Sequence, residues 1–69
     1  MSQASSVLVV EDDPDVRARI CRAIEQEPAL TLMASVGTVH AARSVLGRNL
    51  PRLALIDLGL PDGDGSSLI

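Results

Sequence analysis

Two stretches decide the fold: VLVVEDDP at residues 7–14 and LALIDLGLPDGDG at residues 53–65. Each begins with a continuous apolar run, Val7–Val10 or Leu53–Ile56, which is typical of a short strand buried on both faces. The first run ends in Glu11 and Asp12, and the second ends in Asp57. Two buried strands that both end in carboxylates predict a single acidic pocket, provided that the strands are neighbours.

The sequence between these stretches alternates between helix and strand patterns. Asp13-Pro14 predicts a helix start, with Asp as the N-cap and Pro at the first helical position. We expect strands near residues 6–10, 30–36 and 53–57 and helices near residues 14–27 and 38–47. The apolar side of the first expected helix is formed by Val16, Ile20, Ala23 and Ile24, and its polar side by Arg17, Arg19, Arg22 and Glu25.

This alternation predicts a doubly wound α/β unit with a parallel sheet and right-handed crossovers. Two strand orders fit three such strands. In the order 1-2-3 the acidic ends of the first and third strands lie apart, whereas in the order 2-1-3 they are adjacent. The junction in the second order is a switch point, where open parallel sheets bind ligands beyond the carboxyl ends of their strands. The placement of the acids favours 2-1-3.

Composition narrows the class of protein. The 69 residues include no aromatic residue, so the core of the expected single small domain is aliphatic, and we expect marginal stability. The net charge is −3 and all six cations are Arg, which argues against direct nucleic-acid binding by this segment. A lone cysteine fits a reducing compartment, and no signal peptide or membrane span is visible, so we expect a cytoplasmic protein.

The acidic residues indicate a particular chemistry. Glu11, Asp12 and Asp57 would converge at one edge of the sheet, and such a cluster requires raised pKa values or a cation. An open, all-oxygen set suits Mg²⁺, which keeps several waters and leaves coordination positions for phosphate oxygens. Asp57 could then attack a phosphoryl group as a carboxylate nucleophile.

The same residues resemble a known family. Residues 7–14 together with residues 53–65 look like the receiver domain of bacterial two-component response regulators, which has a flavodoxin-like doubly wound fold. The resemblance implies that Asp57 is the phosphoacceptor and that Glu11 and Asp12 organise Mg²⁺. It also implies that the backbone carbonyl of Gly59 binds the metal, and that Pro61 and Gly65 belong to the adjoining loop.

The resemblance also implies partners and an expected extent. A receiver takes its phosphoryl group from a histidine kinase or a phosphotransfer protein and switches an output, here transcription by family analogy. A receiver also has a Ser or Thr after its fourth strand and a Lys after its fifth. We therefore expect residues 1–69 to be the N-terminal portion of a receiver, about three strands and two helices, that is incompetent for phosphorylation alone.

Two other classes of function remain open. The chain could be an interaction module that self-associates through an exposed sheet edge and apolar helix faces without phosphorylation. It could also be an aspartate-dependent phosphatase of the haloacid dehalogenase type, because Asp13 and Asp15 have the spacing of that family's acids. However, Glu11 stands where the phosphatase nucleophile should be. We therefore expect a signalling module and no enzyme.

Overall fold

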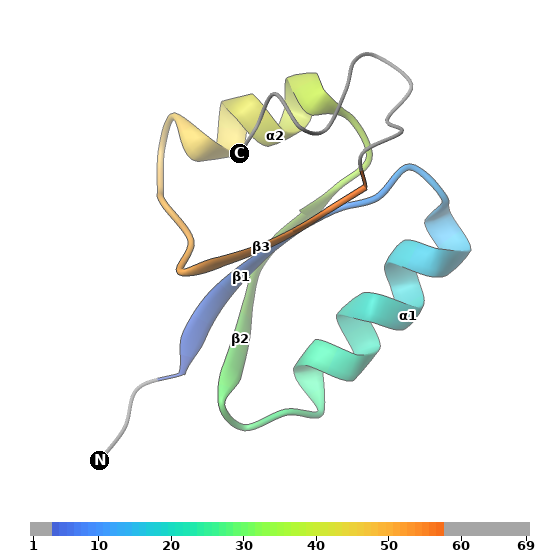
Figure 1. Cartoon of the computed structure of the whole chain (residues 1–69), viewed down its shortest axis with the longest axis vertical. Coiled ribbons are helices and arrows are strands. Elements are labelled where there is room, and N and C mark those ends of the chain that lie inside the picture. The colour runs from blue at the N-terminus through green and yellow to red at the C-terminus, as the bar shows by residue number, and fades with distance from the viewer. Residues whose placement is uncertain (1–3, 58–69) are drawn as a thin grey trace.

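The computed structural model describes residues 4–57 of the chain (Figure 1). The elements alternate along the chain as β1 (Ser5–Val10), α1 (Pro14–Glu25), β2 (Leu30–Val36), α2 (Val39–Leu46) and β3 (Leu53–Ile56). This is the predicted β-α-β-α-β succession. The two helices lie on opposite faces of the sheet, which is seen edge-on between them in Figure 1. The chain therefore adopts the doubly wound arrangement expected from the sequence.

The three strands form one parallel sheet in the order β2-β1-β3, which confirms the predicted 2-1-3 order. The carboxyl end of β1 aligns with both neighbours, because Val10 stands opposite Val36 of β2 and Ile56 of β3. The register of the β1–β2 pair shifts between Val7 and Leu8. Beyond this irregularity the three strands end together, and the residues that follow them share one edge of the sheet.

The core is built around β1, whose last four residues are fully buried. Alternate side chains of a strand point to opposite faces, so β1 supplies two separate apolar clusters. Leu8 and Val10 pack with Val39 and Ala42 of α2 on one face. On the other face, Val7 and Val9 pack with Ile24 of α1, and the partly buried neighbours of this cluster are Ile20, Cys21, Leu30 and Leu32.

The prediction that the third strand is buried was wrong. Leu53 and Leu55 of β3 are 50% and 49% exposed. They lie on the same face as Val7 and Val9, their partners in β1, but α1 covers β1 and β2 on that face and does not reach across β3. Ala23, expected on the apolar side of α1, is also exposed, and Cys21 packs against the core in its place.

The helix ends follow the capping signals in the sequence. The Asp13 side chain accepts hydrogen bonds from the backbone N–H groups of Asp15 and Val16, at 2.9 and 3.3 Å. Thr38 caps α2 through a 3.1 Å bond from the N–H of Ala41. Helix α1 ends at Glu25, slightly before the expected boundary, and α2 is capped by Gly47. Among residues 4–57, no helix is long and apolar enough to cross a membrane.

Replacing the α1 cap, Asp13→Ala, should lower the free energy of unfolding by about 1 kcal/mol, because two backbone N–H groups lose their acceptor. Urea denaturation followed by circular dichroism measures this change. Asp13→Asn is the matched control, since Asn removes the same charge and keeps a capping oxygen. Equal losses for Ala and Asn would show that charge, and not the cap, is what Asp13 contributes.

Candidate functional site

Glu11 and Asp12 stand where the chain leaves β1 and turns toward α1. The parallel ladder continues one step past the strand, since the N–H of Glu11 donates to the carbonyl of Val36 at 3.0 Å. The Asp13 cap then starts α1 immediately. The short connection between a fully buried strand and a capped helix therefore fixes Glu11 and Asp12 at the carboxyl edge of the sheet.

Asp57 is positioned by the pairing of β3 with β1, on the opposite edge of β1 from β2. Its N–H donates to the carbonyl of Val10 at 2.8 Å, the same residue that stands opposite Ile56 in the β1–β3 register. This bond extends the β1–β3 pairing by one residue and sets Asp57 beside the start of the Glu11–Asp12 turn. The acid at the end of β3 thus reaches the site through backbone pairing with the central strand.

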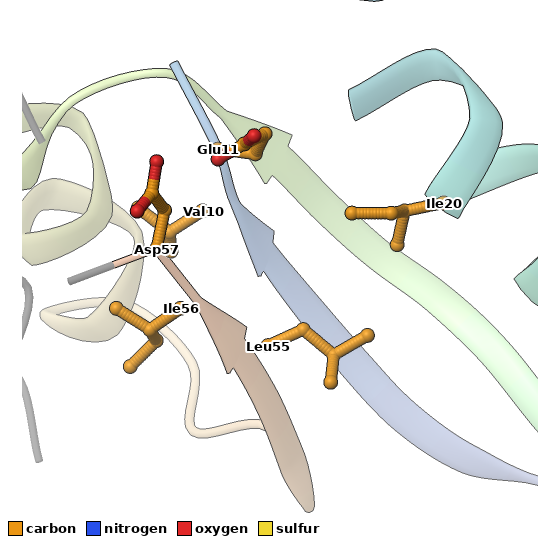
Figure 2. Close-up of a pocket in the computed structure, with 6 residues that line it drawn as sticks. All are labelled: Val10, Glu11, Ile20, Leu55, Ile56 and Asp57. Atoms are coloured by element: carbon orange, nitrogen blue, oxygen red, sulfur yellow. The ribbon is translucent and has the colours of Figure 1, made fainter. Parts of the chain in front are cut away.

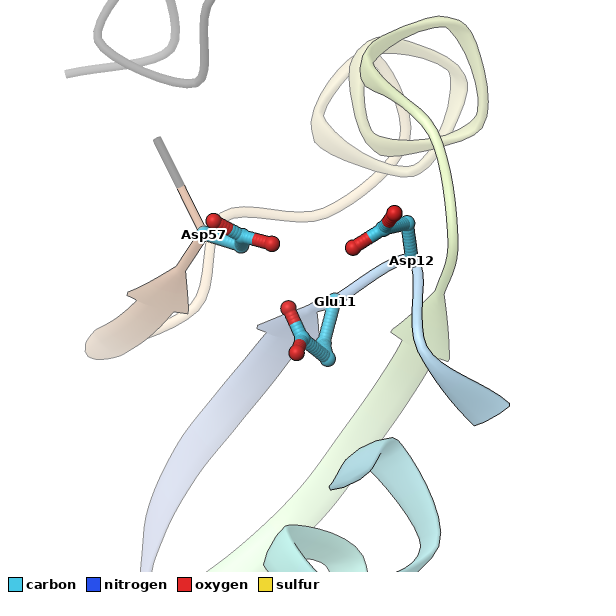
Figure 3. Close-up of side chains that lie close together, drawn as sticks. All are labelled: Glu11, Asp12 and Asp57. Carbon is cyan, nitrogen blue, oxygen red and sulfur yellow. The ribbon is translucent and has the colours of Figure 1, made fainter. Parts of the chain in front are cut away.

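The three carboxylates converge as the sequence predicts. Figure 3 shows the side chains of Glu11, Asp12 and Asp57 turned toward one another across the ends of β1 and β3. One carboxylate oxygen from each residue lies within 4.8 Å of the other two. Asp12 is exposed, while Glu11 and Asp57 are half-buried. The site is therefore open on one side and supported by the sheet on the other.

The neighbours of Glu11 in this cluster raise its pKa. A hydrogen bond to the side chain of Asp57 raises the pKa of Glu11 above its ordinary value of 4.5. Partial loss of hydration and repulsion from Asp57, Asp12 and Asp13 act in the same direction. A proton held between Glu11 and Asp57 is one way to relieve the repulsion, and a bound cation is the other.

The donor set suits a hard divalent cation. All three groups offer carboxylate oxygens, the ligands that Mg²⁺ and Ca²⁺ prefer, and no nitrogen or sulfur ligand belongs to the cluster. Asp13 is engaged in capping α1, and Asp15 is exposed in the first helical turn. Neither belongs to the cluster found among the described residues.

An apolar pocket of about 360 Å³ adjoins the acids. It lies between α1 and β3, and its walls are Val10, Glu11, Ile20, Leu55, Ile56 and Asp57 (Figure 2). Ile20 projects from α1 toward the sheet, and Leu55 rises from β3 on the same side. Glu11 and Asp57 therefore border both the open acidic site and an apolar surface.

Sequence reasoning located the three acids and missed one residue beside them. Gly59, Pro61 and Gly65 lie outside the described residues. Arg17, assigned from the sequence to a solvated helix face, is half-buried and donates a hydrogen bond to the carbonyl oxygen of Glu11 at 2.9 Å. The sequence places Arg17 four residues after the Asp13 cap and Arg19 six residues after it, but neither position shows which guanidinium reaches back to Glu11.

Known proteins share this segment. The chain is 36% identical over 66 residues to the protein-glutamate methylesterase/protein-glutamine glutaminase of group 3 operon of Cereibacter sphaeroides, covering 96% of the chain and 18% of that protein. It is 36% identical over 64 residues to the photosynthetic apparatus regulatory protein RegA of Rhodobacter capsulatus, covering 93% and 34%. It is 40% identical over 63 residues to an uncharacterized 14.6 kDa protein of Leptolyngbya boryana, covering 91% and 47%.

Proteins with different named activities thus contain one segment with this sequence pattern, and the chain spans less than half the length of each of these three relatives. The segment folds with the strand order 2-1-3 and gathers acids at its switch point. The chain belongs to the receiver domains of bacterial response regulators. No protein-family model and no solved structure matches this receiver segment.

The raised pKa of Glu11 predicts how the stability of the metal-free receiver segment varies with pH. A folded-state pKa above the unfolded value of 4.5 means that the folded chain binds more protons in that interval. Stability should therefore fall as pH rises from 4.5 through the raised value. Glu11→Gln, which cannot ionise, should flatten this dependence and stabilise the metal-free protein at pH 7.

Thermal unfolding between pH 4 and pH 8 in a chelating buffer measures the effect. Glu25→Gln, at an exposed position on α1, is the matched control and should retain the dependence of the unaltered chain. A Glu11→Gln variant with an unchanged pH profile would contradict the coupling between Glu11 and Asp57.

Proposed function

We propose that this chain supplies the phosphoacceptor and metal-binding side chains of a receiver that takes a phosphoryl group on Asp57 from a histidine kinase or a phosphotransfer protein. One observation carries the proposal: oxygens of Glu11, Asp12 and Asp57 lie within 4.8 Å of one another at the switch point of the sheet. Neighbouring strand ends present the acids at an open edge, where another protein's phosphorylated side chain can approach.

In this proposal Glu11 and Asp12 hold Mg²⁺ together with one oxygen of Asp57. The resemblance adds the backbone carbonyl of Gly59, which lies outside the described residues. When bound, Mg²⁺ neutralises the acids and the phosphoryl oxygens that meet at the site. Asp57 is half-buried at the end of β3, and the hydrogen bond from its backbone N–H to the carbonyl of Val10 holds it at the open side of the site.

Transfer forms one bond and breaks one. A carboxylate oxygen of Asp57 attacks phosphorus, the P–N bond of the donor phosphohistidine breaks, and the imidazole leaves with the bonding electrons and takes up a proton. The acyl phosphate carries about −1.5 to −2 of charge where the carboxylate carried −1. A change of this size, at a position bonded to the central strand, can bias two states of the domain.

The proposed role is that of a cytoplasmic signalling module, with no enzymatic activity toward a separate substrate. The relatives name two kinds of output, a methylesterase and a regulator of the photosynthetic apparatus. We propose transcription as the output, on the resemblance of residues 58–65 to regulators with DNA-binding domains. Several other relatives also carry the name protein-glutamate methylesterase, which makes a methylesterase the alternative output.

A second candidate function is self-association. The half-exposed Leu53 and Leu55 lie on a strand that forms one edge of the sheet among the described residues. An apolar edge of this kind favours pairing with another chain. Phosphorylation and association are separable, because the two leucines lie along the strand and the acids lie at its end.

Phosphate uptake by the complete receiver tests the role of Asp57. With Mg²⁺ and a small acyl phosphate donor, the unaltered receiver should incorporate hydroxylamine-labile phosphate, and chelation of Mg²⁺ should abolish it. Asp57→Asn should take up none, because the amide is not a nucleophile under these conditions. Asp15→Asn, at an exposed acid outside the cluster, should behave as the unaltered protein. Labile phosphate on Asp57→Asn would overturn the assignment.

Association of the 69-residue chain tests the role of the β3 edge. If β3 mediates it, Leu53→Lys should raise the dissociation constant by about tenfold or more, because a leucine's apolar burial contributes about 1.5–3 kcal/mol. Sedimentation equilibrium measures this constant. Ala23→Lys, at an exposed position on α1, adds the same charge and should leave it unchanged. A chain that is monomeric at millimolar concentration would rule out this candidate.

A further inference from the structure

The main chain of Glu11 is held on both sides of the residue. Its N–H donates to the carbonyl of Val36 at the end of β2, at 3.0 Å. Its carbonyl oxygen accepts from Nη1 of Arg17 at 2.9 Å, in a partly buried position. The first bond ties Glu11 to the sheet and the second ties it to α1. Both contacts act on the turn that carries Glu11 and Asp12 into the acidic cluster.

Arg17 is itself fixed in place by the start of α1. Its backbone N–H donates to the carbonyl of Asp13 at 2.8 Å, the first bond of the helix, and the Asp13 side chain caps the same turn. The guanidinium therefore extends from a rigid turn back over the end of β1. A side chain anchored in this way can hold the Glu11 carbonyl in one orientation.

Gly37 leaves room for this contact. A Cβ atom on Gly37 would lie 2.7 Å from Nη1 of Arg17 and 3.7 Å from the carbonyl oxygen of Glu11. A Cβ atom essentially never comes that close to another heavy atom, so a side chain at residue 37 would make the flexible end of Arg17 shift, while the Glu11 carbonyl would stay in ordinary contact. The size of the side chain at residue 37 therefore affects the hydrogen bond from Arg17 to the Glu11 carbonyl.

We infer that Arg17 is a positioning residue for the acidic site, and that a side chain at residue 37 would disturb its bond to the Glu11 carbonyl. Arg17 holds the Glu11 carbonyl so that the turn presents Glu11 and Asp12 toward Asp57. This inference rests on the proposed function in one respect, that the cluster of Glu11, Asp12 and Asp57 binds a divalent cation.

The charge of Arg17 and its proposed positioning role predict opposite effects of removing this residue on cation binding. Arg17 is a cation near an acidic site, so its charge alone repels Mg²⁺, and removing that charge should strengthen binding. If Arg17 acts by orienting the turn, removing it should weaken binding. Loss of a hydrogen bond that orients metal ligands typically lowers affinity about 10–100-fold. The sign of the change therefore separates the two roles.

The experiment is a calorimetric titration of the 69-residue chain with Mg²⁺ at low ionic strength, below the unfolding temperature of each variant. Arg17→Gln should weaken Mg²⁺ binding by about tenfold, at the lower end of that range. Arg19→Gln, at an exposed position on the same helix, gives the same net charge and should bind Mg²⁺ as tightly as the unaltered chain or slightly more tightly. Arg17→Lys keeps the charge and a donor and should restore part of the affinity.

Gly37→Ala tests the same contact with the charge of Arg17 retained, and should weaken Mg²⁺ binding in the same direction as Arg17→Gln. If Arg17→Gln does not fold, Gly37→Ala and Arg17→Lys test the positioning role in its place. Both variants keep a positive charge at residue 17, and both should bind Mg²⁺ more weakly than the unaltered chain. In the folded variants, the carbonyl ¹³C shift of Glu11 should move in the metal-free state, which reports the lost bond without reference to the cation.

The outcomes distinguish this inference from the proposed function. Mg²⁺ binding by the unaltered chain, with Arg17→Gln equal to or tighter than Arg19→Gln, overturns the positioning role and leaves the metal site standing. Equal Mg²⁺ affinities of Gly37→Ala and the unaltered chain, with the carbonyl ¹³C signal of Glu11 displaced in the variant, overturn it as well. No Mg²⁺ binding by the unaltered chain overturns the metal site, and the positioning role with it.

Discussion

The structure depends on parallel pairing of β1 with a strand on each side. Because β1 is central, its four terminal residues are fully buried, and the polar groups that follow emerge together at one edge of the sheet. The bonds Glu11 to Val36 and Asp57 to Val10 continue the two ladders beyond the strands. Backbone pairing therefore brings together acids that are 46 residues apart in the sequence.

Bringing the three acids together is electrostatically unfavourable, because their carboxylates carry like charges. Three carboxylates within 4.8 Å repel one another. The hydrogen bond to Asp57 is the main cause of the raised pKa of Glu11, and this repulsion adds to it. A protein tolerates such a cluster when a proton or a cation relieves the repulsion. A cation at this site would do so while leaving Asp57 able to act as a nucleophile, whereas a proton shared between Glu11 and Asp57 would not.

The sequence predicted the strand order and the acidic cluster because both follow from local patterns. Apolar runs that end in acid mark strand ends, and Asp13-Pro14 marks a helix start. The exposure of Leu53 and Leu55 was missed, because an apolar run does not reveal which neighbours cover it. Arg17 was missed for a related reason, since its bond to Glu11 depends on how α1 lies over the end of β1.

The most direct test of this account is ¹³C NMR of the side-chain carboxyl groups during addition of Mg²⁺ to the 69-residue chain. If the three acids form one cation site, the carboxyl signals of Glu11, Asp12 and Asp57 shift along one saturable curve with a single dissociation constant, while those of Asp15 and Glu25 stay in place. Signals that shift independently, or a shift at Asp12 without one at Asp57, would show that the ends of β1 and β3 do not form one cation site.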